Sequence, residues 1–569
     1  MGPNRLVAAA LAALLTVVLD GCGSDPLSPG GSSPSTPAPA PAPAPSPAAP
    51  TAPTLKGPQL ARRMALDLTQ SLPVAQDVTT LTNDATQLPA LVGAYLAAGS
   101  AGRALAALHP RMWGLDSRKL PDLDAMAPAS GNAALQSALT PDGATRLQIV
   151  QEPALYVRHV VEHHLPFSEI FNAGYTLSSP PLLSLWNLTP TGDAFLGEPT
   201  QFATYPDGRP ASGLLSTPGL LAAFPSRSDP ALRQRTAAIL GTLLCLSNEG
   251  PAGHAFTDLT ATELQSDLAT LAATRTPCTG CHAPLDSMAA AYAGLGSTTP
   301  FSPWLTYTAP ATPVTGTDAG QSFTGLAGLA ASIAADTRAG RCELTRLAEA
   351  VYQRPLATEA DVQALAKAVD ALGHSGGDLA HATQALFASP EYGYAVIPPS
   401  LSGPVLRQSS GVRILSLAQW QGLVAQLAPG ATPADLSDDL DPGHDEAFTA
   451  TDMMPTGAYW HRVDRLAREV ATAIVATELA DGVPAATRRL LTDLPDGAGN
   501  SASTAVIQQQ LIDLWKRLTT VTLAATDTKL QQLLTLWGAA LAGSDAASFR
   551  AAWTTVLVAM LTDPTFLTY

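Results

Sequence analysis

The sequence has few charged and few aromatic residues, and it lacks the apolar runs of an integral membrane protein. Asp, Glu, Lys and Arg make up 14% of its 569 residues, and Phe, Trp and Tyr make up 5%. Beyond Leu19 no segment is apolar enough to span a bilayer. The net charge of −16, without a basic cluster, argues against binding to nucleic acid. Ala and Leu dominate the remainder, so we expect a large soluble protein of mainly α structure.

Common catalytic signatures are absent as well. The chain contains no G-x-S-x-G, no P-loop, no H-E-x-x-H and no dinucleotide-binding fingerprint. One related pattern is present, because His159, Glu162 and His163 have the H-x-x-E-H order of the inverzincin metallopeptidases. Such an enzyme needs a third, acidic ligand from a distant segment, and the sequence marks none. We favour an ordinary helix with a polar edge and keep a zinc hydrolase as a weaker alternative.

Cysteine is scarce, and two of the five cysteines form a C-x-x-C-H motif with Cys278, Cys281 and His282. This spacing lets two thiols bond the two vinyl groups of one haem, while the histidine ligates the iron. A structural disulfide or half of a zinc site is the alternative, but a second C-x-x-C is missing. The motif therefore predicts one covalent haem c, with Cys278 and Cys281 as thioether anchors and His282 as proximal ligand.

The N-terminus has the features of an export signal. Arg5 precedes an apolar run from Leu6 to Leu19, which is too short for a membrane span and long enough for a signal-peptide core. The following Asp20-Gly21-Cys22 resembles the end of a lipoprotein lipobox, in which the cysteine receives lipid. We therefore predict a signal peptide over 1–21 and a lipid anchor on Cys22 at the outer membrane or cell surface, with simple secretion as the alternative.

The mature chain divides into a linker and three helical segments. Residues 22–57 are rich in Pro, Ala and Ser and predict an extended polyproline II tether. Helical domains are expected over 58–145, over 146–397 with the C-x-x-C-H motif, and over 398–569. The last domain is a possible repeat of the first half, because Thr358–Tyr392 and Thr526–Phe566 both predict two helices that end in a proline and an aromatic residue. Only the first half carries the haem motif.

Counting leaves Cys245 and Cys342 as one pair once lipid and haem take the other cysteines. In an oxidising compartment the simplest hypothesis is a disulfide between them, and two separate buried thiols are the alternative.

Two helices can be predicted in detail. One helix is predicted to have Pro89 in its first turn and to stop at Gly99. Its apolar residues with one-face spacing are Leu88, Leu91, Val92, Tyr95 and Leu96. Thr358 and Asp361 predict a capping box that opens another helix. We expect the inner face of this second helix to be formed by three apolar side chains, Val362, Leu365 and Val369.

Several of these segments together resemble the secreted planctomycete-type cytochrome c proteins, large bacterial proteins of mostly unknown function. The similarity includes Arg-Arg-Met-Ala-Leu-Asp-Leu-Thr at 62–69, Gly-Leu-Leu-Ser-Thr-Pro at 213–218 and the motif at 278–282, followed by Leu285-Asp286. It extends, with gaps, over most of 62–394. The resemblance implies a helical fold and a haem, and it implies no substrate.

The function predicted from these patterns is electron transfer at the cell envelope by a c-type cytochrome. The expected partners are the membrane, through the lipid on Cys22, and an unknown redox protein. The alternatives are a non-redox surface lipoprotein that serves as a helical binding or scaffold module, a haem enzyme, and the zinc hydrolase. The second axial ligand is open: Met288 is too close to His282 in sequence, and the candidates by residue type are Met126, His254, Met453 and Met454.

Overall fold

The computed structural model describes residues 54–115, 120, 144–194, 200–224, 229–246, 285–295, 307, 309–310, 314–318, 321–352, 355–356, 358–393, 413–431, 457–496 and 502–569. Helices contain 68% of the described residues, which confirms the expected mainly α fold. The haem motif at 278–282, the lipidation site Cys22 and the four distal-ligand candidates lie outside the described residues, as do the signal peptide and nearly all of the linker.

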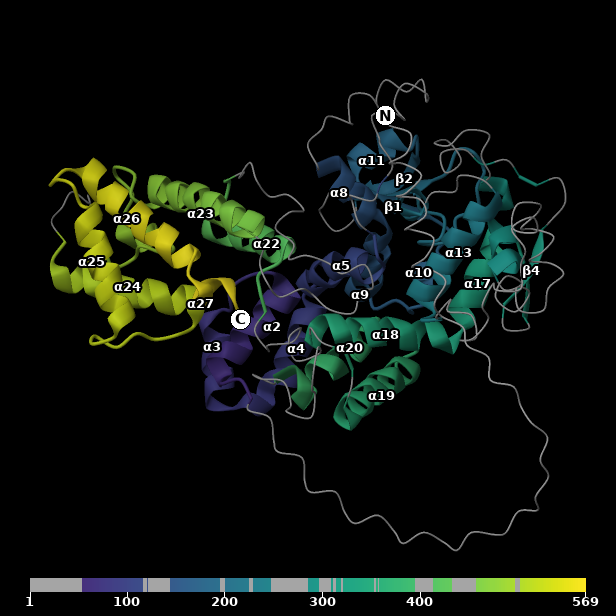
Figure 1. Cartoon of the computed structure of the whole chain (residues 1–569), viewed down its shortest axis with the longest axis horizontal. Coiled ribbons are helices and arrows are strands. Elements are labelled where there is room, and N and C mark those ends of the chain that lie inside the picture. The colour runs from purple at the N-terminus through teal and green to yellow at the C-terminus, as the bar shows by residue number, and fades with distance from the viewer. Residues whose placement is uncertain are drawn as a thin grey trace, which may run out of the picture.

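The described helices form two groups (Figure 1). Each group packs around a hydrophobic core. Those of the first core are α2 (Gly57–Thr69), α3 (Ala75–Asn83), α4 (Leu88–Ala97), α5 (Ser100–Met112), α8 (Ala144–Gln151), α9 (Leu155–Glu162), α10 (Glu169–Asn172), α11 (Pro180–Leu185), α12 (Pro218–Ala223), α13 (Asp229–Leu243), α17 (Gly325–Ala335), α18 (Thr337–Tyr352), α19 (Glu359–His374) and α20 (Leu379–Phe387). Those of the second are α22 (Leu417–Leu427), α23 (Gly457–Glu478), α24 (Thr504–Thr519), α25 (Thr528–Ala540), α26 (Ala546–Leu561) and α27 (Pro564–Leu567). The first core takes side chains from both of the first two predicted helical domains.

Short 3-10 helices connect some of these elements: η1 (Ala85–Gln87), η3 (Glu152–Ala154), η6 (Ala290–Leu295), η7 (Pro390–Gly393) and η9 (Ala485–Thr487). In the described part of the chain no single helix is long and apolar enough to cross a bilayer. One helix pair bent by 89°, Ala85–Ala97 with Ala101–Met112, meets the criteria of length and composition.

Two small antiparallel sheets accompany the first core. Strands β1 (Thr176–Ser178), β2 (Thr189–Ala194) and β3 (Gln201–Thr204) form a sheet in the order β1-β3-β2, in which Leu177 lies opposite Phe202. Strands β4 (Thr315–Asp318) and β5 (Gln321–Thr324) form a second pair. The strands are three to six residues long, so they contain too few alternations of apolar and polar residues to be recognised.

Local signals fix both ends of α4 and the start of α19, as predicted. Helix α4 begins at Leu88 with a proline in its first turn, and Gly99, with a φ of 76°, separates it from α5. In α19 the side chain of Thr358 accepts from the main-chain N–H of Asp361, and the Asp361 carboxylate accepts from the N–H of Thr358.

The expected inner face of α19 is partly wrong. Val362 is 55% exposed, whereas Leu365 is buried and Val369 is half-buried against the first core. The buried face consists of Asp361, Ala364, Leu365 and Ala368, so small alanine side chains and the capping carboxylate take the place of the valine. Alanine side chains allow a neighbouring helix to approach closely. The buried face of α19 is therefore rotated toward Ala364 and Ala368, away from the predicted position of Val362.

Helix α2 lies between the two cores. Its Leu60 and Met64 pack in the first core, while Leu66 packs in the second. Figure 1 shows α2 next to the place where the helices α22 to α27 meet the rest of the molecule. Helix α2 is therefore shared by both parts of the fold.

Candidate functional site

The described residues on either side of the haem motif end at Leu246 and begin again at Leu285. These two flanks, residues 229–246 and 285–295, pack against each other. The guanidinium of Arg235, in α13, lies 5.4 Å from the ring centre of Tyr292, in η6. Both side chains are fully buried. Arg235 Nε also donates to the carbonyl oxygen of Phe224 at 3.0 Å, which fixes the guanidinium in place. Helix α13, which precedes the motif in sequence, and η6, which follows it, are therefore in contact within the first core.

A disulfide holds the first of these flanks. Cys245 and Cys342, the pair that the cysteine count leaves over, are bonded with an S–S distance of 2.08 Å and a Cα–Cα distance of 5.3 Å. Cys245 follows α13, and Cys342 belongs to α18. The bond thus attaches the chain just before the haem-motif segment to a helix 97 residues away in sequence.

Two buried polar groups at these flanks have no hydrogen-bond partner among the described residues. They are Nη1 of Arg235 and the hydroxyl of Tyr292. Burial lowers the pKa of Arg235 to about 10, against an opposing contribution from Tyr292, so the guanidinium stays charged at neutral pH. Nε and Nη2 of Arg235 already donate to the carbonyl oxygens of Phe224 and Leu221, so Nη1 is the guanidinium nitrogen that can take a further acceptor. Met288, close by in sequence, is buried in the first core.

The H-x-x-E-H pattern lies on α9 and at its C-terminal end, and it forms a packed helix edge. The ring of His159 is 4.7 Å from that of His163 and 5.4 Å from that of Phe202. Burial, and then the charge of His163, lower the pKa of His159 to about 4. Glu162 accepts a hydrogen bond from Arg158 Nε at 2.9 Å, and both side chains are buried. A carboxylate held by a buried arginine is poorly placed to activate water, so the geometry favours the ordinary helix.

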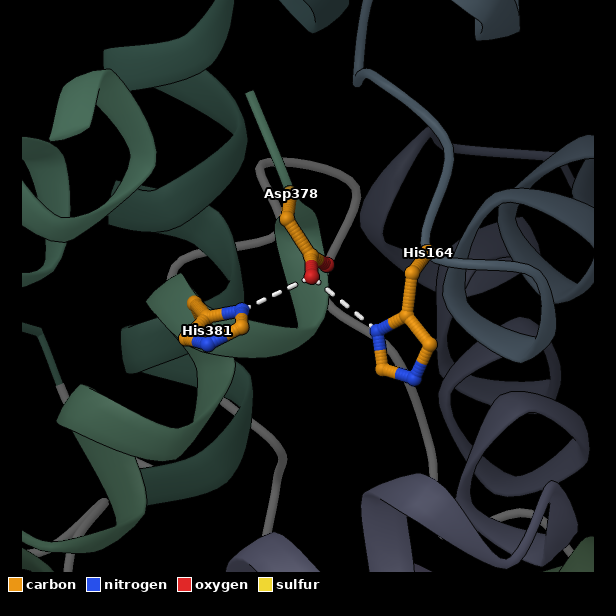
Figure 2. Close-up of side chains that lie close together, drawn as sticks. All are labelled: His164, Asp378 and His381. Carbon is orange, nitrogen blue, oxygen red and sulfur yellow. Dashed lines mark hydrogen bonds and ion pairs between the residues drawn. The ribbon is translucent and has the colours of Figure 1, made fainter. Parts of the chain in front are cut away.

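The structure brings together a different set of metal-ligating side chains, which sequence reasoning missed. His164, Asp378 and His381 each offer one donor atom, and these atoms lie within 4.8 Å of one another (Figure 2). Among the described residues this is the one group of three or more such side chains that meets this spacing. His164 is 214 residues from Asp378, and no local spacing pattern links them. The sequence signal is limited to the D-x-x-H pair at 378–381.

A buried acid, Glu152, lies in η3 and accepts hydrogen bonds from neutral donors. It accepts from the Ser178 hydroxyl at 3.0 Å and from the main-chain N–H of Gly219 at 2.8 Å. Burial raises its pKa to about 7, although these hydrogen bonds and the charge of Arg209 oppose the shift. Glu152 thus titrates near neutral pH inside the fold.

No family model matches the sequence, and neither a curated protein nor a solved structure is detectably similar to it.

Proposed function

We propose that the protein is an exported, lipid-anchored c-type cytochrome that carries one covalent haem and transfers electrons at the cell envelope. The observation that carries this proposal is the C-x-x-C-H motif at 278–282 in a chain whose other internal cysteines, Cys245 and Cys342, form a disulfide. Disulfides persist in oxidising compartments, which lie outside the cytoplasm. A lipobox directs a protein to the same compartments. The resemblance to the planctomycete-type cytochrome c proteins points the same way.

The residues present fit a haem in three respects. Cys278 and Cys281 would form the thioethers, and His282 would bind the iron on the proximal side. Arg235 and Tyr292, where the flanks of the motif segment meet, offer buried donors that suit a propionate carboxylate. A bound haem supplies a one-electron redox centre, and the protein sets its potential through ligands, hydrogen bonds and burial.

The experiment is expression of the full chain with the cytochrome c maturation machinery, followed by visible spectroscopy and haem staining after denaturing electrophoresis. We expect a Soret band and a stain that survives denaturation. His282→Ala should reduce covalent haem or shift the Soret band, and Cys278→Ala should shift the pyridine haemochrome band because one thioether is lost. His374→Ala is the matched control, because His374 is exposed and pairs with its helix neighbour Asp370.

A colourless protein would contradict the cytochrome and leave the helical scaffold lipoprotein as the function to pursue. The lipid anchor is tested separately by Cys22→Ser, which should release the protein from membranes since one lipidated residue carries the whole attachment. If this variant still sediments with membranes after a high-salt wash, the lipoprotein assignment fails while the haem assignment stands.

A further inference from the structure

Three metal-ligating side chains converge where the chain between α9 and α10 crosses the turn between α19 and α20 (Figure 2). One oxygen of Asp378, Oδ2, accepts from His164 Nδ1 at 3.0 Å and from His381 Nδ1 at 2.7 Å. The two imidazoles thus approach a single carboxylate oxygen from opposite segments. The convergence is tertiary, and it does not follow from neighbouring positions on one helix.

The backbone around Asp378 fixes the carboxylate in this orientation. Its other oxygen, Oδ1, accepts from the N–H of Ala380 at 2.8 Å and caps α20. The main-chain N–H of Phe167 donates to the carbonyl oxygen of Gly377 at 2.7 Å, which holds the two segments together. The cap occupies Oδ1 and leaves Oδ2 to the two imidazoles. The carboxylate is therefore preorganised before any ligand arrives.

His164 has a backbone conformation that non-glycine residues seldom adopt. Its φ is 53°, in the left-handed region, and it follows directly after α9 and its capping residue His163. Such a conformation costs on the order of 1 kcal/mol and persists where the surrounding structure imposes it. Here it turns the chain out of α9 so that the imidazole of His164 reaches Asp378.

The charge and exposure of the three side chains suit a cation that also binds water. The Asp378 carboxylate accepts hydrogen bonds from His381, from His164 and from the main-chain N–H of Ala380. The carboxylate is 9% exposed, whereas the side chains of His164 and His381 are 47% and 61% exposed. An anchored anion thus lies beneath two solvent-accessible imidazoles.

We propose that His164, Asp378 and His381 form a binding site for a divalent transition-metal ion such as Zn²⁺, with its remaining coordination positions open to solvent. Two imidazoles and one carboxylate select such an ion over Mg²⁺ or Ca²⁺, which prefer oxygen ligands. Metal–ligand bonds of about 2.0–2.2 Å separate the donors of a tetrahedral site by about 3.3 Å. The two exposed rings can reach this spacing by small rotations that replace their hydrogen bonds to Asp378. The proposal is independent of the haem.

The test is isothermal titration of Zn²⁺ into the haem-loaded full-length protein, in which the C-x-x-C-H thiols are occupied. We expect a stoichiometric site with a Kd in the micromolar range or below, and no heat from Mg²⁺ at that site. His164→Ala and His381→Ala should each weaken this binding at least about tenfold, because each removes a ligand outright. Asp378→Asn keeps a side chain that caps α20 and removes the anionic ligand, so it should weaken binding as well.

The matched control is His374→Ala, which removes an exposed histidine from the neighbouring helix α19 and should leave the Kd unchanged. Thermal unfolding supplies an independent readout, because a ligand that binds only the folded state raises the Tm. Zn²⁺ should raise the Tm of the parent protein by a few degrees and should not raise that of His381→Ala. The absence of binding in the parent, or an equal Kd in the parent and in both histidine variants, would overturn the proposal.

Discussion

Arg62 and Arg63 are consecutive residues of α2, yet their guanidinium groups bind carbonyl oxygens in two different helical units. The first unit is α19, α20 and η7, and the second is α25, α26 and α27. Arg62 Nη2 donates to the carbonyl oxygen of Phe566 at 2.6 Å, and Arg63 Nη1 donates to that of Tyr392 at 3.0 Å. Phe566 and Tyr392 are the buried aromatic residues of the two Pro-aromatic endings. One helix thus contacts equivalent positions in both units.

The two units also have the same order of elements. In the first, α19 and α20 are followed by η7, which begins at Pro390. In the second, α25 and α26 are followed by α27, which begins at Pro564. Asp67, one turn further along α2, accepts from the hydroxyls of Tyr392 at 2.9 Å and Tyr569 at 3.0 Å and pairs with Arg413. A buried polar network on α2 therefore joins the two cores.

We predict that Arg62→Met destabilises the part of the fold around the second core by about 2–3 kcal/mol. The substitution keeps much of the apolar stem but leaves the buried carbonyls of Leu518 and Phe566 without their charged donor. Hydrogen exchange should increase first in α24 and α27. Arg63→Met should act instead on the first core, with faster exchange in η7.

Arg468→Met is the control for these two variants. Arg468 forms an exposed pair with Asp464, and its loss should change stability by less than about 0.5 kcal/mol. If Arg62→Met and Arg63→Met gave the same exchange pattern, the two arginines would not stabilise separate units.

The sequence predicts those parts of the fold that local rules determine. Pro89 and Gly99 mark the limits of α4, and Thr358 with Asp361 marks the start of α19, because caps and proline act within one turn. Val362 shows the limit of the same rules. Its exposure depends on which helix packs against α19, and a periodic pattern in one helix contains no information about its neighbour.

The candidate sites divide along the same line. The C-x-x-C-H motif is local and can be read directly, and the pairing of Cys245 with Cys342 follows from counting. The cluster of His164, Asp378 and His381 depends on a contact between segments 214 residues apart. Contacts between residues this far apart in the sequence arise from the packing of whole helices. They cannot be inferred from residue spacing.

We predict that removing the disulfide destabilises the first core while the fold of the second core is retained. Cys245→Ser with Cys342→Ser opens a loop whose ends are 97 residues apart in sequence, and the expected loss is about 2–5 kcal/mol. Denaturant unfolding of the double variant measures the loss. Unfolding of the parent protein in reducing buffer should approach the same midpoint.

The haem signal provides a second readout for this variant. Because the disulfide holds the chain immediately before the motif segment, we expect lower haem incorporation at 37 °C than in the parent. Equal stability of the parent and the double variant would show that packing alone fixes this flank.

Glu152 makes the stability of the first core depend on pH. Its pKa in the folded chain is about 7, above the ordinary value of 4.5, chiefly because the side chain is buried. The folded state therefore binds this proton more tightly than the unfolded state. The resulting stabilisation is complete below about pH 4.5 and is lost as the pH rises through 7, with a total amplitude on the order of 3 kcal/mol.

Glu152→Gln should remove this dependence. Its amide oxygen can accept from the Gly219 N–H and its amide nitrogen can donate to the Ser178 hydroxyl, so both contacts persist without a buried charge. Relative to the parent, the variant should therefore gain stability between pH 5 and pH 8, as measured by urea unfolding at each pH. His159 has a lowered pKa and contributes in the opposite sense, because it destabilises the folded state as the pH falls below about 6.5. This contribution is the same in both proteins, so it cancels in the difference between their free energies of unfolding. Glu359→Gln, an exposed substitution, should differ from the parent by less than about 0.5 kcal/mol at every pH. A difference between Glu152→Gln and the parent that is the same at pH 5 and pH 8 would show that Glu152 does not change its charge in this range.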